Sequence, residues 1–207
     1  KLGGEVLEIK NYILLTSEGK LQINVVRCSS DSEAQQVYET LLAVKESELY
    51  DQKLGMYRVN SNLERESYEI GRARAFSSGW LENGSIWLHM EYKYLLELIK
   101  NGLIEEYYQA IDDALIPFQD PETYGRSILE NSSFILSSLN KDSKNHGRGY
   151  IARLSGSTAE YINMWSLMAF GKEPFKSEAG ELIYAPKPNL AAEMFTREKR
   201  VEKLQLS

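Results

Sequence analysis

Cysteine is almost absent from this sequence, and its scarcity excludes several classes of protein. The single cysteine, Cys28, can form neither an internal disulfide bond nor a cysteine-built zinc site. Only two histidines are present, His89 and His146, so a histidine-rich metal site has no support either. We therefore expect a cytoplasmic protein with no resident metal or other cofactor.

Long apolar runs and an excess of positive charge are also lacking. No stretch approaches the roughly 18 consecutive apolar residues that a membrane-spanning helix needs. The 24 basic residues are outnumbered by 30 acidic ones, which gives a formal net charge of -6. Because affinity for nucleic acid depends on lysine and arginine neutralising phosphates, we expect no nucleic-acid partner and no membrane partner.

Aromatic residues, by contrast, are abundant and often polar. The chain has 13 tyrosines and 3 tryptophans, several of them beside Asn, Arg, His or Glu. Sugars are bound by aromatic faces together with planar polar groups, so carbohydrate is one partner that this composition favours. Filling of a hydrophobic core is the more common use of such residues and remains the alternative.

The hydrophobic pattern predicts a mainly α chain with short β segments at both ends. Apolar residues at helical spacing indicate helices at about 30–50, 85–101, 103–115 and 157–170. Alternating patterns indicate a β-hairpin within 5–27 and short strands at 181–185 and 203–206. Short connections between helices predict antiparallel helix pairs.

Two irregular stretches, 51–84 and 121–156, interrupt this pattern and concentrate Arg, Glu, Asn and Tyr. Long ordered loops in compact proteins are often functional. We predict that residues 60–84 and 124–153 meet and line a sugar-sized cleft, with structural salt bridges as the alternative role of the charges. The candidate sugar-binding residues are Arg72, Glu82, Asn83, Arg126, Glu130 and Arg153.

The start of the last predicted helix has the features of an anion site. Ser157 and Glu160 have the spacing of a capping box, which would place Ser155 and Gly156 just ahead of the helix. Free backbone N–H groups and the helix dipole favour a negative ligand there. An ordinary capped helix that binds nothing is the alternative.

Three segments in this order resemble the cellobiose and chitobiose phosphorylases, together with the corresponding domain of cyclic β-1,2-glucan synthases. They are GRARAFSSGWLENGSIWLHM at 71–90, ARLSGSTAEY at 152–161 and FGKEP at 170–174. The chain departs from the family pattern at Ser155, where the family has Thr, at Ser85, where it has Gly, and at Met90, where it has a small residue.

The resemblance implies a fold, an activity and a set of ligands. It implies a partial (α/α)6 barrel at 31–176, followed by the start of a C-terminal β-domain at 177–207. The β-hairpin segment at 1–30 is predicted from its strand pattern alone and has no counterpart in the family. The resemblance also implies inorganic phosphate as co-substrate, bound by His89, Ser155 and Gly156, in phosphorolysis of a β-glycosidic bond of a disaccharide or oligosaccharide. The family's general acid lies on an earlier part of the barrel, so no residue here is predicted to be catalytic.

Partners and alternatives follow from that assignment. We expect the chain to pack with the rest of a parent polypeptide and to be capable of forming a homodimer. We expect no turnover by the chain alone. A hydrolase of the same fold, and a non-catalytic carbohydrate-binding or structural domain, are the other functions that the sequence leaves open.

Overall fold

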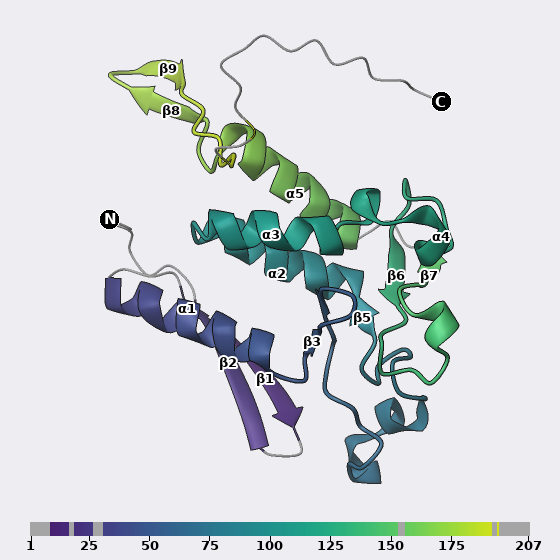
Figure 1. Cartoon of the computed structure of the whole chain (residues 1–207). Coiled ribbons are helices and arrows are strands. Elements are labelled where there is room, and N and C mark those ends of the chain that lie inside the picture. Colours follow the sequence, from purple (N-terminus) through teal and green to yellow (C-terminus); the bar gives the residue numbers. More distant parts are fainter. Residues whose placement is uncertain (1–8, 17–18, 27–30, 153–155, 192–193, 195–207) are drawn as a thin grey trace.

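A layer of three helices forms the centre of the molecule, and small antiparallel sheets surround it (Figure 1). The computed structural model describes residues 9–16, 19–26, 31–152, 156–191 and 194. The three helices are α2 (Leu88–Lys100), α3 (Ile104–Ala114) and α5 (Gly156–Phe170).

Helix α2 lies at the middle of this layer because it is apolar over most of its surface. Leu88, Tyr92, Leu95 and Ile99 are buried at helical spacing and pack against α3 and α5. On α5, Met164 and Met168 complete the core, while on α3 the buried side chains are those of Tyr107, Ile111 and Ala114. The hydroxyl of Tyr107 lies 3.1 Å from the sulfur of Met168, which joins α3 to α5.

The turn between α2 and α3 is as predicted. Gly102 comes directly after Asn101, the C-cap of α2, with a φ of +77°, the left-handed conformation that glycine adopts most readily after a helix. Helix α2 nevertheless begins three residues later than the predicted 85. Ile86 and Trp87 form strand β5 (Ile86–Trp87) instead, because they pair with Ile135 and Phe134.

The stretch at 121–156 contains more regular structure than its sequence predicted. Strand β6 (Ser132–Ile135) lies between β5 and β7 (Gly149–Ala152) in an antiparallel three-stranded sheet, which adjoins the start of α2. Short helical turns occupy parts of the same stretch, namely α4 (Pro121–Tyr124) and η4 (Ser143–Asn145), and η3 (Ile116–Phe118) lies just before it.

The N-terminal part of the described chain contains the predicted hairpin. Strands β1 (Ile9–Thr16) and β2 (Gly19–Val26) pair antiparallel, with Thr16 opposite Gly19. Helix α1 (Asp31–Glu46) follows, and then a second, smaller pair of strands, β3 (Tyr50–Asp51) and β4 (Met56–Tyr57). Two 3-10 turns, η1 (Tyr68–Ile70) and η2 (Arg72–Ala75), interrupt the irregular loop that comes next.

After α5 the chain forms a last hairpin. Gly171, with a φ of +77°, ends the helix where the sequence placed its end. Strands β8 (Phe175–Glu178) and β9 (Glu181–Tyr184) then pair antiparallel, with most of their side chains exposed. The strand predicted at 203–206 lies outside the described residues.

The expected partial (α/α)6 barrel is wrong. Such a barrel is built from successive antiparallel helix pairs, whereas α3 and α5 are separated here by β6, β7 and long loops. Moreover, α2 and α5 begin at the same end of the layer, so these two packed helices run in the same direction (Figure 1). The polar residues of 121–156 account for the difference, because strand pairing with β5 places them beside the helices rather than in one.

Candidate functional site

His89 and Gly156 lie in direct contact at the point where α2 and α5 begin. A Cβ built on Gly156 would lie 2.5 Å from Nδ1 of His89 and 2.6 Å from Cε1, so the imidazole ring covers the glycine. His89 is in the first turn of α2, and Gly156 is the first residue of α5. Two helix N-termini, both positive ends of helix dipoles, therefore converge beside an imidazole.

The N–H groups in the first turn of a helix have no acceptor within the helix, so an anion can accept hydrogen bonds from them. No described side chain caps the start of α2, where Trp87 occupies the N-cap position. The first turn of α5 contains no acidic residue. Ser155 and Arg153, the other two predicted ligands of this region, lie outside the described residues.

Glu160 occupies a position that the sequence did not predict. Because α5 already begins at Gly156, Ser157 lies inside its first turn and is buried, so the predicted capping box with Glu160 is wrong. The Glu160 carboxylate instead approaches His89, with Oε1 3.6 Å from Nε2. The two groups form an ion pair when the imidazole is protonated, and the carboxylate competes with any anion at that edge of the ring.

The two polar stretches that were predicted to meet are in contact. Asn140 donates from its side chain to the carbonyl of Ser78 at 2.7 Å, and the N–H of Ser137 donates to the carbonyl of Gly79. The Trp80 ring lies edge-on against Tyr150, with centroids 4.5 Å apart. The prediction that these stretches pack together is thus confirmed.

A hollow of about 270 Å³ opens where the stretches meet, next to the start of α2. Its lining combines aromatic and aliphatic side chains with one ion pair, and consists of Arg72, Phe76, Leu81, Glu82, Trp87, Ser133, Phe134 and Ile151. The indole of Trp87 directly precedes α2 and lies two residues before His89 in the chain. The hollow and the helix starts are therefore neighbouring features.

Backbone strain is concentrated around this hollow. Leu81 and Ile151, both in its lining, have φ values of +47° and +58°, a region that residues other than glycine adopt rarely and β-branched residues most rarely. The carbonyl of Leu81 is held by the side chains of Trp87 and Ser85. Such strain persists only where surrounding contacts impose it, and it is frequent at binding sites.

Of the remaining residues predicted to bind sugar, only Arg72 and Glu82 line the hollow. Arg72 and Glu82 pair at the mouth of the hollow, where the Arg72 side chain is 81% exposed. Arg126 and Glu130 form a separate ion pair at 3.3 Å in the loop after α4 and do not line the hollow. Asn83 is fully buried, and its side-chain amide accepts a hydrogen bond from the N–H of Leu63 and donates one to the carbonyl of Phe76. Its role is therefore to hold together the loop that contains these residues.

Sequence reasoning missed two buried polar groups near the helix starts. The hydroxyl of Tyr92 donates to Asn131 at 2.9 Å, and the Asn131 amide reaches Thr158 in the first turn of α5. Burial raises the pKa of the Glu91 carboxyl to about 8, although its Oε2 accepts the N–H of Tyr57 at 2.9 Å. Helical spacing could have found Glu91, because it follows Leu88 and precedes Leu95 on the buried face of α2.

No protein-family model and no curated protein matches the chain. No described helix has both the length and the apolar character that crossing a membrane requires. Within the described ranges, no group of three or more His, Cys, Asp or Glu residues is arranged to hold a metal ion.

Proposed function

We propose that this chain supplies the phosphate-binding and sugar-binding part of a cytoplasmic enzyme that cleaves β-glycosidic bonds by phosphorolysis. The observation that carries the proposal is the contact between His89 and Gly156 at the joint start of α2 and α5. The resemblance to disaccharide phosphorylases assigns phosphate to these same two residues and to Ser155.

The role of the helix starts is to bind and orient the nucleophile. A phosphate at the edge of the His89 ring accepts hydrogen bonds from N–H groups of α5 and from the imidazole, and both helix dipoles favour its charge. Such an arrangement accelerates phosphorolysis by positioning and electrostatics. Phosphate then attacks the anomeric carbon while a general acid, which we assign to no residue of this chain, protonates the leaving oxygen.

The hollow beside Trp87 is the proposed sugar site. Its aromatic rings offer apolar faces, and the paired Arg72 and Glu82 offer planar polar groups at its mouth. Since Trp87 directly precedes the helix that carries His89, a sugar held there lies next to the phosphate.

Carbohydrate binding without phosphorolysis is a second candidate. The observation that favours it is the Glu160 carboxylate, which stands 3.6 Å from Nε2 of His89, where it repels phosphate. This second candidate predicts that the hollow binds sugar and that the starts of α2 and α5 bind no anion.

Titration of the chain with inorganic phosphate and with cellobiose tests the proposal. With only two histidines, the imidazole signals in ¹H–¹⁵N spectra can be assigned by single substitution. We expect phosphate to shift the His89 signals, His89→Gln to weaken binding by about tenfold or more, and Glu160→Gln to strengthen it. His146→Gln, which removes the other histidine, is the matched control.

The two candidates give different results in this experiment. Phosphate binding that requires His89 and tightens with Glu160→Gln supports phosphorolysis. Cellobiose binding that requires Trp87 with no phosphate binding by any variant supports the second candidate. Binding of neither ligand would contradict both.

A further inference from the structure

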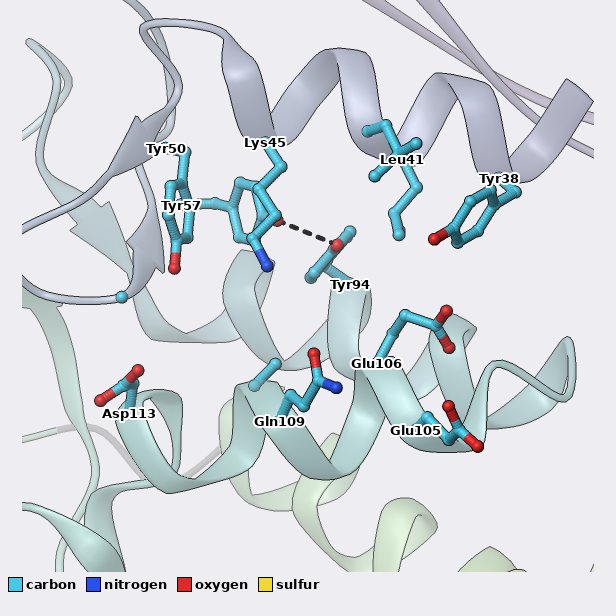
Figure 2. A pocket seen from close by; sticks show the side chains of 13 residues that line it. Tyr38, Leu41, Lys45, Tyr50, Tyr57, Tyr94, Glu105, Glu106, Gln109 and Asp113 are labelled. Carbon is cyan, nitrogen blue, oxygen red and sulfur yellow. Dashed lines mark hydrogen bonds between the residues drawn. The ribbon is translucent and has the colours of Figure 1, made fainter.

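A second pocket, of about 210 Å³, lies between α1 and α3 (Figure 2). None of its lining residues is among those proposed to bind phosphate or sugar. One side is formed by tyrosines and by Lys45 of α1, and the opposite side by polar residues of α3. The volume corresponds to several water molecules at about 30 Å³ each, so a small organic molecule fits.

Three tyrosine rings form a continuous aromatic wall in this pocket. The ring centroids of Tyr50 and Tyr57 are 5.0 Å apart, and those of Tyr57 and Tyr94 are 4.4 Å apart. The hydroxyl of Tyr94 donates to that of Tyr57 at 3.1 Å, which fixes two of the rings (Figure 2). They come from β3, β4 and α2, so the tertiary structure alone brings them together.

The facing wall on α3 is acidic. Glu105, Glu106 and Asp113 line the pocket, and among the described residues none of the three takes part in an ion pair. A Cβ on Gly55 would lie 2.4 Å from Oδ2 of Asp113, so the glycine leaves room for this carboxylate. With Lys45 as the one basic lining residue, three carboxylates and one ammonium give the pocket a formal charge of -2.

A cation is already held against this wall by the chain itself. The ammonium of Lys45 lies 5.8 Å from the centroid of the Tyr50 ring, within the range of cation–π attraction. The pKa of Tyr50 is raised, first by burial and then by the charge of Asp113, consistent with a negative potential at the ring. Lys45 is exposed at the end of α1, so its ammonium can leave for water.

We propose that this pocket binds a small alkylammonium ion, whose apolar substituents pack on the tyrosine rings while its charge faces Glu106 and Asp113. Ring faces attract such a cation, and the carboxylates add to that attraction. A neutral sugar gains nothing from the net charge of the pocket. Lys45 acts as an internal competitor, which an incoming cation displaces.

The test uses the whole chain, with choline as the probe and 3,3-dimethylbutan-1-ol, its uncharged isostere, as the matched ligand. Binding is followed by tyrosine fluorescence and by shifts of the tyrosine ring signals. We expect choline to bind about tenfold or more tightly than the alcohol. We expect Asp113→Asn and Glu106→Gln each to weaken choline binding by about three- to fivefold, and Lys45→Met to strengthen it.

Glu97→Gln is the control substitution, because Glu97 pairs with Lys100 outside the pocket, and it leaves choline binding unchanged. His89→Gln also leaves it unchanged, so the result is independent of the phosphate proposal. Equal affinity for choline and the alcohol, or full choline binding after both carboxylates are neutralised, would overturn the proposal. Binding of cellobiose to this pocket without any binding of choline would also overturn the proposal. Circular dichroism checks that each variant is folded.

Discussion

The imidazole ring of His89 takes the space that a side chain at residue 156 would need. Nδ1, Cε1 and Cγ of the ring all lie within 2.7 Å of the Cβ position of Gly156. Glycine at this position therefore lets the first turns of α2 and α5 approach each other.

Replacing Gly156 should lower phosphate affinity while leaving the stability of the fold nearly unchanged. In Gly156→Ala the new Cβ displaces the His89 ring, and we expect phosphate affinity to fall by about tenfold through the lost charge-assisted hydrogen bond. Alanine favours helical conformation, so the midpoint of thermal unfolding changes little. The histidine NMR shifts and a phosphate titration measure the effect. Unchanged shifts of His89 in the variant would show that the two residues are not in contact in solution.

Glu91 makes stability depend on pH. Burial raises its pKa to about 8 from an ordinary value of 4.5, so between these values the folded chain retains a proton that the unfolded chain releases. The free energy of unfolding consequently falls as pH rises from 4.5 to 8, by on the order of 4 kcal/mol at most.

Urea midpoints at pH 5, 6.5 and 8 measure this dependence. Glu91→Gln carries no titrating proton and still offers an amide oxygen to the N–H of Tyr57. We expect a flatter pH profile for the variant and greater stability than the parent at pH 8. Parallel profiles of the two proteins would contradict the assignment.

Asp51 and Arg58 form a desolvated ion pair beside the β3–β4 strand pair, and the Asp51 carboxylate joins this pair to the distant loop at Ser138. The carboxylate is fully buried, lies 3.2 Å from the guanidinium, and accepts the N–H of Ser138 at 2.7 Å. Asp51→Asn leaves the Arg58 charge without its partner, so we expect a loss of about 3–5 kcal/mol of unfolding free energy. Denaturant unfolding measures it, with Asp112→Asn, at an exposed carboxylate of α3, as the neutral control.

Adjacent residues of α5 differ sharply in burial and should differ in their contribution to stability. Met164 is fully buried against α2, whereas Trp165 is 47% exposed. We expect Met164→Ala to cost about 2–5 kcal/mol and Trp165→Ala about 1 kcal/mol or less. Equal losses in denaturant unfolding would mean that the outer face of α5 is covered in solution.

The chain by itself is expected to release no sugar phosphate from cellobiose or a β-glucan. Loss of a general acid alone lowers the rate by about 10²- to 10⁴-fold. Phosphate-dependent release of sugar phosphate by the purified chain would contradict this expectation. Asp51 is a poor candidate acid in any case, because its carboxylate is committed to Arg58 and Ser138. Loss of turnover in Asp112→Asn or Asp113→Asn would then identify the acid.

Local sequence determined the elements whose signals are local. The end of α2 at Gly102, the end of α5 at Gly171 and the hairpin of β1 and β2 follow from glycine conformation and alternating hydrophobicity, and each was predicted. The contact between the two polar stretches was also predicted, because polar and aromatic residues without periodicity are unsuited to a core. Short strands such as β6 were missed, since four residues are too few for a periodic pattern.

Long-range pairing decided everything else. The antiparallel partners of β5 lie some 50 residues away in the chain, and they replaced the expected barrel helices with a sheet. Helix α5 begins at 156 rather than at the predicted 157, so Ser157 is not its N-cap. The contact of Glu160 with His89 depends on the packing of α5 against α2. The tyrosine pocket likewise draws on five separate elements, α1, β3, β4, α2 and α3. Periodicity reports which face of an element is apolar, but only packing in three dimensions selects the partner that covers it.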